Sequence, residues 1–337
     1  MKAAVVHGAG DLRVEERPDP TPGPGQVLMK LEWGGICGSD IAYVKYGQSG
    51  TAVLKNPMIL GHEFAGTVVG VGEGVDVPIG TRAAVYPPMP VGDYVMPERL
   101  KGRDNLYPTV KYYGSAATVP HTDGGFASLK VVQADQLRVL PENVDTKHGA
   151  LAEPFAVAIH AVHRAGDIKG KDILVNGAGP IGSLVIGALK HLGAGKISAA
   201  DINDSSLKVA KAMGADVTVN VTREALPEKE LVFEASGAAG ALGGVLHAVE
   251  RGGTLIQVGN LSISPVTAVL GDLVTREIDW LGSFRFINEM DDAIRFMSEG
   301  LDLTPVMSHT FPLDQAVEAF ETAMDPNSGS CKIMLEL

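Results

Sequence analysis

Asp172-Ile173-Leu174-Val175-Asn176-Gly177-Ala178-Gly179-Pro180-Ile181-Gly182 is the stretch that decides the fold of this chain. It predicts a short buried strand over residues 172–175, and residues 183–192 continue it with a helical pattern. Between them, the first glycine makes a tight turn, the second lets a pyrophosphate approach the backbone, and the third lets the helix pack on the strand. The stretch therefore predicts a parallel doubly wound sheet with a dinucleotide at the helix N-terminus. The expected cofactor-binding residues of this loop are Gly177, Gly179, Pro180, Ile181 and Gly182.

An acidic residue at the end of the next predicted strand strengthens this interpretation. A Gly-x-Gly-x-x-Gly pattern is a weak signal alone, but the strand predicted at 196–200 leads into Asp201, whose carboxylate can bind the ribose hydroxyls. That carboxylate would repel the extra phosphate of NADP, and residues 202–206 contain no arginine to bind it. The predicted cofactor is therefore NAD, with Val258 and Gly259, at the end of a later strand, also lining the pocket. A glycine-rich turn without a ligand, and Asp201 as a helix cap, are the alternative interpretations.

The rest of the chain divides by pattern into three segments. Residues 1–148 carry short β-branched runs between Pro and Gly clusters, which predicts a β-barrel-like domain. Residues 149–283 alternate strands with helices, which predicts the α/β domain that holds the dinucleotide. Residues 284–337 contain two amphipathic helical patterns and a closing strand, and we expect this tail to return to the first domain. Residues 86–125 have little periodicity and predict a lobe.

Composition excludes several classes of function. With 337 residues and a net charge of -12, the chain is long enough for about two domains and too acidic for a nucleic-acid surface. The N-terminal apolar run is too short for a secretory signal, and the most apolar stretch, 173–192, is interrupted by Asn176, Lys190, glycines and a proline, so we expect no membrane span. Two cysteines cannot form a disulfide framework. These features predict a cytoplasmic enzyme that acts on a small molecule.

The part of the chain before the dinucleotide loop contains four residues that could bind zinc in an open site. A catalytic zinc ion takes about three protein ligands and leaves one position for water or a substrate oxygen. Cys37 and His62 can supply a thiolate and an imidazole, and either Glu63 or Glu153 can supply a carboxylate. Zinc at such a site would polarise the hydroxyl group from which hydride leaves, which is the chemistry that a nicotinamide cofactor needs. From spacing alone, however, Cys37 is more readily an inert buried thiol, and His62 and Glu63 an ordinary hydrogen-bonded pair.

Several motifs together resemble those of the zinc-dependent medium-chain alcohol and polyol dehydrogenases. Residues 61–66, Gly61-His62-Glu63-Phe64-Ala65-Gly66, are similar to the zinc signature of that family and are followed by Gly70, Gly72, Gly74 and Val75. Residues 35–40, residues 152–154 and the dinucleotide loop occur in the family's order and spacing, so the resemblance covers essentially the whole chain. Residues 56–60, 112–126 and 282–286 are similar to the branch of sorbitol and L-idonate 5-dehydrogenases.

The resemblance implies a fold, a reaction and roles for the matching residues. The fold is a Rossmann NAD domain with a GroES-like β-barrel catalytic domain, in a dimer or tetramer. The reaction is oxidation of a secondary alcohol of a sugar acid or polyol, with L-idonate to 5-ketogluconate as the best match and sorbitol, xylitol or a simple secondary alcohol as alternatives. Zinc would be held by Cys37 and His62 with Glu63 or Glu153, and Ser39 would pass the alcohol proton toward solvent. Substrate hydroxyls would be oriented by Tyr43, Glu153 and Arg285.

The guanidinium group of Arg285 gives a physical reason to expect that this residue binds substrate. A guanidinium group can bind a substrate carboxylate through two parallel hydrogen bonds, which suits a sugar acid. A surface ion pair is the alternative interpretation of this residue.

The chain also departs from the family pattern. Many relatives carry four cysteines in the lobe, which bind a second, structural zinc ion, whereas this chain has Val91, Tyr94, Pro97 and Tyr107 there. The resemblance therefore implies one zinc ion per chain and no structural zinc. Ala42 replaces a histidine common in the branch, and Phe286 lacks a tyrosine hydroxyl, which puts sorbitol itself in doubt. Two rival functions, an NADPH-linked quinone or enone reductase and a non-catalytic nucleotide-binding protein, require none of the predicted zinc ligands.

Overall fold

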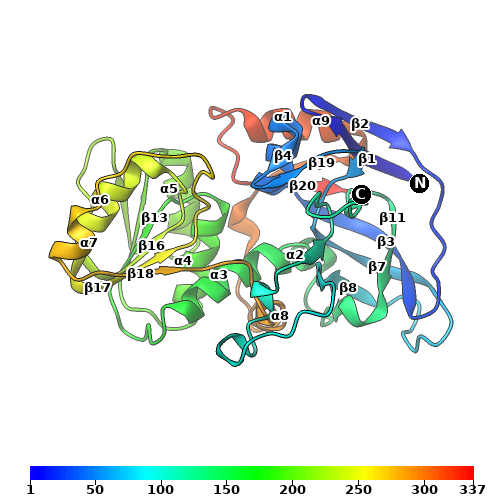
Figure 1. The fold of residues 1–337 in the computed structure, drawn as a ribbon, viewed down its shortest axis with the longest axis horizontal. Helices are drawn as coiled ribbons and strands as arrows, with labels where there is room; N and C mark the ends of the chain where they lie inside the picture. Colours follow the sequence, from blue (N-terminus) through cyan, green and yellow to red (C-terminus); the bar gives the residue numbers. More distant parts are fainter. The chain divides into compact units, whose positions relative to one another are not determined.

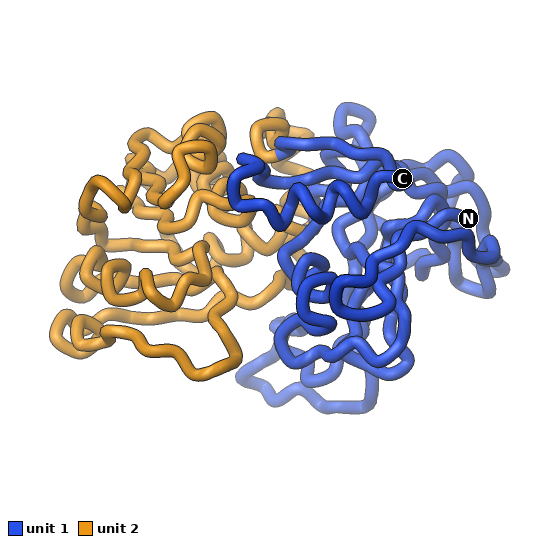
Figure 2. The backbone as a smooth tube through the Cα atoms, turned by 90° about the horizontal axis from the view of Figure 1, so that it is seen from above, with its two compact units in different colours: residues 1–153, 307–337 blue, residues 154–306 orange.

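The computed structural model describes residues 1–337, which form two compact units (Figure 2). The first unit contains residues 1–153 and 307–337, and the second contains residues 154–306. The chain thus returns to the first unit, as its sequence predicts, but at residue 307 and not at residue 284. The intervening helix α8 (Glu289–Ser298) stays in the second unit because Phe296 packs against the rings of Phe155 and His191.

The first unit is built around a seven-stranded sheet with the order β12-β8-β7-β3-β20-β19, in which β11 also pairs with β3 (Figure 1). A three-stranded sheet, β2-β1-β6, and a two-stranded pair, β4-β5, complete this part of the unit. Antiparallel pairing of short β-branched runs follows from the sequence pattern, since Val27, Met29 and Leu31 alternate with less buried residues along β3. The strands are β1 (Lys2–Gly8), β2 (Asp11–Glu16), β3 (Gln26–Gly35), β4 (Gln48–Ser49), β5 (Ala52–Val53), β6 (Met58–Ile59), β7 (Glu63–Val71), β8 (Arg82–Val85), β11 (Leu129–Gln133), β12 (Leu137–Val139), β19 (Met307–Pro312) and β20 (Lys332–Glu336).

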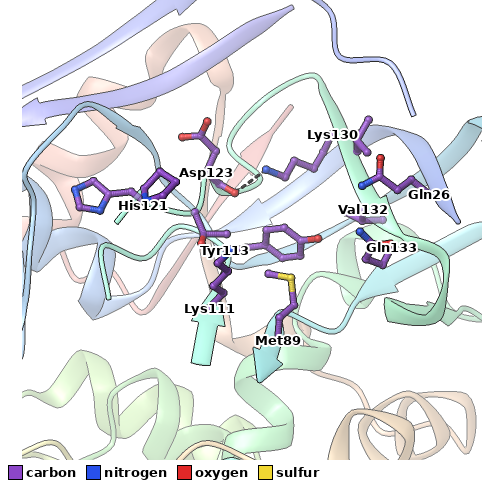
Figure 3. Close-up of a pocket in the computed structure, with 12 residues that line it drawn as sticks. Gln26, Met89, Lys111, Tyr113, His121, Asp123, Lys130, Val132 and Gln133 are labelled. Carbon is purple, nitrogen blue, oxygen red and sulfur yellow. Dashed lines mark hydrogen bonds between the residues drawn. The ribbon is translucent and has the colours of Figure 1, made fainter. Parts of the chain in front are cut away.

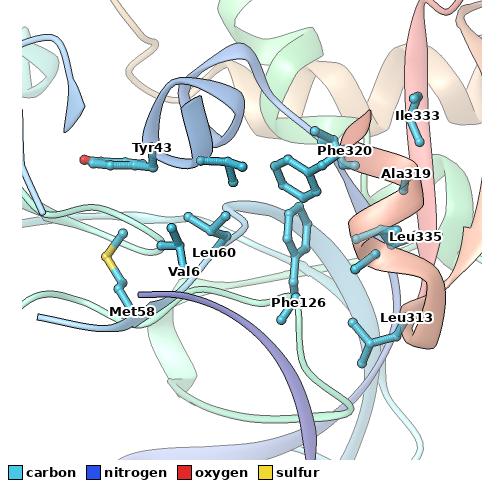
Figure 4. Packing of buried hydrophobic residues seen from close by; sticks show 14 of the residues in the cluster. Val6, Tyr43, Met58, Leu60, Phe126, Leu313, Ala319, Phe320, Ile333 and Leu335 are labelled. Carbon is cyan, nitrogen blue, oxygen red and sulfur yellow. The ribbon is translucent and has the colours of Figure 1, made fainter. Parts of the chain in front are cut away.

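A core of apolar side chains joins the two ends of the chain within the first unit (Figure 4). Phe126 and Phe320 meet edge to face, with ring centroids 6.3 Å apart. Phe320 belongs to α9 (Ala316–Met324), whereas Val6 and Leu60 come from the N-terminal half. This packing explains why the tail after residue 307 folds onto the first unit. The other helices of this unit are α1 (Gly38–Tyr46) and α2 (Thr146–Gly149).

The lobe within the first unit has little regular structure, in agreement with its sequence. It contains one antiparallel pair, β9 (Pro88–Pro90) with β10 (Val110–Tyr112), and two short 3₁₀ turns. Tyr94 and Tyr107 stand at two of the positions where the family resemblance implies cysteines, and their rings meet edge to face with centroids 5.8 Å apart. The Tyr107 hydroxyl also accepts a hydrogen bond from the Tyr94 N–H and donates one to the Gly92 carbonyl. An aromatic pair and two hydrogen bonds thus hold this part of the lobe.

The second unit is a six-stranded parallel sheet in the order β15-β14-β13-β16-β17-β18 (Figure 1). This is the doubly wound order 3-2-1-4-5-6, so the predicted fold class is confirmed. Its central strand β13 is buried at every position, as expected for a sheet covered on both faces. No helix of the chain is long and apolar enough to cross a membrane. The strands are β13 (Ile173–Asn176), β14 (Ile197–Asp201), β15 (Val217–Asn220), β16 (Lys229–Glu234), β17 (Val249–Gln257) and β18 (Asp279–Gly282), and the further helices are α3 (Ala152–Arg164), α4 (Pro180–His191), α5 (Asp204–Ala212), α6 (Leu242–His247) and α7 (Gly271–Thr275).

Candidate metal and cofactor sites

Strand pairing brings the predicted zinc ligands together in the first unit. Glu63, the first residue of β7, pairs with Gly35, the last residue of β3. Cys37 lies two residues after Gly35, and His62 lies directly before Glu63, so the pairing brings both close to Glu63. The ligand atoms of Cys37, His62 and Glu63 all lie within 4.8 Å of one another. His62 and Glu63 are buried and Cys37 is half-buried. We call these three residues the ligand cluster.

Asp40 holds the two turns of the ligand cluster in place. One of its carboxylate oxygens accepts a hydrogen bond from the Cys37 N–H (3.0 Å), and the other accepts one from the Gly61 N–H (3.1 Å). The latter oxygen also lies 3.7 Å from Nδ1 of His62. The carboxylate is fully buried and links the turn that carries the thiol to the turn that carries the imidazole. Carboxylates beside metal-binding histidines commonly have such an orienting role.

Lys332, on β20, forms a buried ion pair with Glu63. Its Nζ donates to both carboxylate oxygens of Glu63 at 2.8 Å and to the Ile36 carbonyl at 3.1 Å. Burial alone would lower the pKa of Lys332, but the negative charge of Glu63 outweighs it and raises this pKa to about 12. Gly35 makes room for the pair, because a Cβ atom there would lie 2.3 Å from Oε2 of Glu63. The strands therefore place a carboxylate in the cluster together with a permanent cation.

Glu153, the second residue of α3, completes the polar surroundings of the ligand cluster. It is buried and accepts a hydrogen bond of 2.5 Å from the hydroxyl of Tyr112, whose ring also contacts the His62 ring edge to face. Burial raises the pKa of Glu153; the charge of His62 opposes this rise, and the charge of Glu63 adds to it. Glu153 thus lies within electrostatic range of both His62 and Glu63.

The charge balance of the cluster suits a cation. Burial alone would lower the pKa of His62, but the negative charges of Asp40 and Cys37 outweigh it and raise this pKa well above its usual range. A divalent ion and a proton would compete for this ring. A thiol, an imidazole and a carboxylate in one half-buried group are also the donor types that zinc prefers. The residues present thus fit the zinc ion that the sequence predicts.

The remaining predicted site residues in the first unit have different surroundings. Ser39 is half-buried in the first turn of α1, two residues from Cys37. Tyr43, in contrast, is only 2% exposed, lies in the apolar core, and accepts a hydrogen bond from the Ala116 N–H through its hydroxyl (Figure 4). Its position argues against the predicted contact with substrate hydroxyls, because both its ring and its hydroxyl already have partners. We therefore regard Tyr43 as a packing residue.

Arg285 belongs to the second unit, in the turn after β18. Its backbone φ of 52° lies in the left-handed region, which is uncommon for residues other than glycine. Its guanidinium carbon lies 4.8 Å from the centroid of the Phe284 ring. The predicted contact of Arg285 with substrate stays a prediction. An unusual backbone conformation in this turn is consistent with a functional constraint.

The dinucleotide loop has the backbone that its sequence predicts. Gly177 adopts a φ of 90°, and a Cβ atom there would lie 2.4 Å from the Ser236 N. A Cβ atom on Gly182 would lie 1.7 Å from the Gly177 carbonyl oxygen, so this glycine permits the close packing of α4 on β13. Nothing lies within 4 Å of a Cβ atom on Gly179, and no side chain caps the N-terminus of α4, which begins at Pro180. The open space and the uncapped amides suit a pyrophosphate.

Asp201 lies at the end of β14, as predicted, and already contacts the dinucleotide loop. One carboxylate oxygen accepts a hydrogen bond from the Ala178 N–H and the other from the Asn203 N–H, each at 2.8 Å. A carboxylate with two oxygens retains free lone pairs in such an arrangement, so ribose hydroxyls remain possible partners. Val258 and Gly259 follow β17, and their N–H groups donate to the Glu234 carbonyl at 2.8 and 2.9 Å.

Three residues near the ligand cluster were not predicted to have a role. Lys332 and Tyr112 reach Glu63 and Glu153 from distant parts of the sequence, and Asp40 lies inside a motif of which only the cysteine and serine were assigned. A lysine in a closing strand, such as Lys332, is ordinarily expected to be exposed. The lobe around Tyr112 has no periodicity from which the position of its side chain could be predicted. Only Asp40, three residues after a candidate ligand, carried a local signal, that of a helix-capping acid.

A separate cavity of about 310 Å³ in the first unit shares no lining residue with the ligand cluster (Figure 3). Nζ of Lys130 donates to the Asp123 carbonyl at 2.6 Å and lies 4.9 Å from the centroid of the Tyr113 ring. Burial lowers the pKa of Lys130 to about 8. His121, which also lines the cavity, accepts hydrogen bonds from the N–H groups of Lys55 and Asn56, so it anchors a loop.

Comparisons with known proteins agree with this arrangement. An alcohol dehydrogenase GroES-like domain matches residues 23–142, and a zinc-binding dehydrogenase domain matches residues 180–299. The sorbitol dehydrogenase of Gallus gallus is 38% identical over 349 residues, which cover 99% of this chain and 96% of the relative. The solved structure of L-idonate 5-dehydrogenase from Escherichia coli matches with a TM-score of 0.92 and 33% identity, over 100% of this chain and 98% of that chain.

Two further structures bear on the cofactor. An alcohol dehydrogenase from Escherichia coli complexed with NADH and a zinc-binding dehydrogenase from Sinorhizobium meliloti bound to NADP are each 27% identical. Their TM-scores are 0.87 and 0.89, and each match covers 100% of this chain and 99% of the other. The fold, the two matched domains and the identity to sorbitol dehydrogenase over nearly the full length lead to one conclusion. The chain belongs to the zinc-dependent medium-chain polyol dehydrogenases, oxidoreductases that act on CH–OH groups and use zinc and a nicotinamide cofactor.

Proposed function

We propose that this dehydrogenase oxidises a secondary alcohol of a sugar acid or polyol, with L-idonate to 5-ketogluconate as the best candidate reaction and NAD as the acceptor. The observation that carries the proposal is the ligand cluster of Cys37, His62 and Glu63, with Glu153 beside it, in the same chain as an open dinucleotide loop. The similarity to L-idonate 5-dehydrogenase and to sorbitol dehydrogenase supports this substrate class.

Cys37, His62 and Glu63 would hold the zinc ion. Glu63 can serve as a ligand while Lys332 is bound, because a carboxylate has about four lone-pair sites and Lys332 uses only part of them. Glu153 lies outside the group of atoms within 4.8 Å of one another, so we assign it to the open side of the metal. There its carboxylate, oriented by the Tyr112 hydroxyl, would bind water or a substrate hydroxyl.

The residues around the site divide the remaining work of the reaction. Zinc, when bound, stabilises the substrate oxygen as hydride leaves for NAD. Ser39, half-buried near Cys37, would pass the alcohol proton toward solvent. Asp40 would hold together the two turns that carry Cys37 and His62. Lys332 would neutralise the buried carboxylate of Glu63.

The substrate is tested by a panel assay. We expect NADH formation to be fastest with L-idonate, and slower with sorbitol, xylitol and simple secondary alcohols, because Arg285 can bind a carboxylate through two hydrogen bonds. Arg285→Met should lower kcat/KM for the sugar acid at least about tenfold and change that for sorbitol little, since a charged hydrogen bond contributes about 1.5–3 kcal/mol. Activity on simple alcohols alone would contradict the sugar-acid proposal, and an equal loss on both substrates would contradict the role of Arg285.

Asp201 is proposed to select NAD over NADP. In the variant Asp201→Ser, we expect kcat/KM with NAD to fall and that with NADP to rise, so that the NAD/NADP preference drops at least about tenfold. The physical reason is that the carboxylate binds ribose hydroxyls and repels a phosphate at the same place. Steady-state kinetics with both cofactors at fixed substrate measures the ratio. A preference that does not change would limit the role of Asp201 to its hydrogen bonds with the Ala178 and Asn203 N–H groups.

Three further parts of the proposal concern the whole chain. We infer one zinc ion per chain, because the lobe carries Tyr94 and Tyr107 where relatives have cysteines and a hydrogen-bonded aromatic pair links them. A homo-oligomer, a dimer or a tetramer, fits the exposed edge strand β18 and the exposed apolar residues Val269 and Val274 near it. A cytoplasmic location, which the two unpaired cysteines support, completes it.

A further inference from the structure

A buried acidic residue at the carboxyl edge of the second unit's sheet has no role in the function proposed above. Glu234 is the last residue of β16 and is fully buried, yet no lysine, arginine or histidine pairs with it. β16 and β17 lie on the side of β13 opposite to β14, where Asp201 is expected to bind the adenosine ribose. In a doubly wound sheet of this order, the other half of the dinucleotide crosses to the side of β16 and β17.

Five donors converge on the carboxylate of Glu234. One oxygen accepts hydrogen bonds from the amide group of Asn176 and from the N–H and hydroxyl of Ser236. The other accepts from the Gly237 N–H at 3.1 Å and from Nε2 of Gln257 at 2.6 Å. These donors come from three places, namely the end of β13, the loop after β16 and the end of β17. A buried carboxylate without a cation is stabilised only by such donors, so the three segments are fixed relative to one another.

The backbone around Glu234 leaves little room for these loops to shift. The Glu234 carbonyl accepts hydrogen bonds from the N–H groups of both Val258 and Gly259. A Cβ atom on Gly259 would lie 2.3 Å from the Gly237 N, and one on Gly177 would lie 2.4 Å from the Ser236 N. The loops after β13, β16 and β17 therefore touch backbone to backbone, and Glu234 lies where they meet. Displacing its carboxylate would move all three.

Two buried polar atoms beside this network lack partners. Oε1 of Gln257 has no hydrogen bond, although Nε2 of the same group donates to Glu234 and to the Gly259 carbonyl. The hydroxyl of Ser283, which follows β18, also has none, and the Ser283 N–H donates to the Gln257 carbonyl. Buried acceptors and hydroxyls are nearly always paired in a folded protein, so such atoms indicate a place for a polar group. The nicotinamide carboxamide supplies both a donor and an acceptor.

We propose that Glu234 is a positioning residue for the nicotinamide half of the cofactor. It does not contact the cofactor but sets the loop after β16 and the loop after β17, the second of which carries Val258 and Gly259. This inference rests on the proposed NAD-linked function. It predicts that a change at Glu234 weakens binding of the nicotinamide half and leaves binding of the adenosine half, at the loop next to Asp201, largely unchanged.

The test compares NADH with ADP-ribose, which lacks the nicotinamide ring, on the full-length zinc-loaded enzyme. Glu234→Gln keeps the shape of the side chain but places an NH₂ group against donors in either orientation of the amide. We expect its Kd for NADH, measured by calorimetry, to rise at least about tenfold, with less than about a twofold change for ADP-ribose. The KM for NAD should rise more than the KM for the polyol. An equal loss for both ligands, or no loss for NADH, would overturn the proposal.

Two further variants keep the result interpretable. Gln257→Met removes one donor to Glu234 and should show the same selective loss to a smaller degree, which also covers the case that Glu234→Gln does not fold. Asp216→Asn is the matched control, because Asp216 caps the Ile197 N–H at the opposite, amino edge of the same sheet, and it should bind both ligands as the unaltered enzyme does. If Gln257→Met also bound both ligands normally, the proposal would be wrong. Failure of the unaltered enzyme to bind NADH would instead contradict the proposed function itself.

Discussion

Replacing Cys37 by alanine is expected to give a folded enzyme that has lost zinc and polyol oxidation together. The thiolate is one of three ligand groups within 4.8 Å of one another, and an open zinc site depends on about three protein ligands. Since a metal ion acting as a Lewis acid contributes several kcal/mol to the transition state, kcat should fall on the order of a thousandfold. Zinc content by elemental analysis and NADH formation with the best polyol measure both effects.

The chain offers a matched control for this variant. Cys331, the other cysteine, lies just before β20 and outside the ligand cluster, so Cys331→Ala should keep its zinc and its activity. NADH binding should persist in Cys37→Ala, because the dinucleotide loop belongs to the second unit. Full activity of Cys37→Ala, or zinc retained at the level of the unaltered enzyme, would rule out the assigned site.

Replacing Lys332 by methionine is expected to cause the largest loss of stability among single substitutions near the site. Lys332 and Glu63 are 3% and 1% exposed, and removal of one partner from such a pair leaves a buried charge, which costs about 3–5 kcal/mol. Because the pKa of Lys332 is raised from 10.5 to about 12, the pair contributes its full stability below pH 10.5 and loses it as the pH rises through about 12. Urea unfolding of the zinc-free protein at pH 7 therefore measures the whole effect.

Two comparisons separate the ion pair from general effects of the mutation. Lys332→Met combined with Glu63→Gln removes both charges and should recover most of the lost free energy of unfolding. Lys2→Met breaks an ion pair with Asp314 that is exposed on both sides, and should change the free energy of unfolding little. If Lys332→Met were as stable as Lys2→Met, the buried pair would not have the structural role assigned to it.

The parts of this enzyme that the sequence predicts well are those in which neighbouring residues carry all the information. Residues 172–182 predict a strand, a glycine turn and a helix start, and each glycine has the close contact or open space that its role requires. The residue types alone leave the pairing of Cys37 with His62 open and the family resemblance favours it, since their proximity depends on the register of β3 with β7. Strand register between distant segments is not readable from local periodicity.

The residues missed or misjudged have partners far along the chain. Lys332 lies 269 residues from Glu63, and no local pattern in β20 distinguishes a buried ion pair from an exposed lysine. The family resemblance implies a substrate contact for Tyr43, but α1 directs this side chain into the core, where its hydroxyl accepts a hydrogen bond from the Ala116 N–H. The sequence predicts too early an end for the second unit. The amphipathic pattern of α8 indicates that the helix packs against other elements, but it does not indicate to which unit those elements belong.

The zinc content of the purified, full-length enzyme tests the central claim most directly. Elemental analysis after dialysis should find one zinc ion per chain in the unaltered enzyme and none in Cys37→Ala, with activity lost on chelation and restored by added zinc. Two zinc ions per chain would contradict the assignment of the lobe as metal-free. An enzyme that holds no zinc and still oxidises polyols at full rate would contradict the account of the site as a whole.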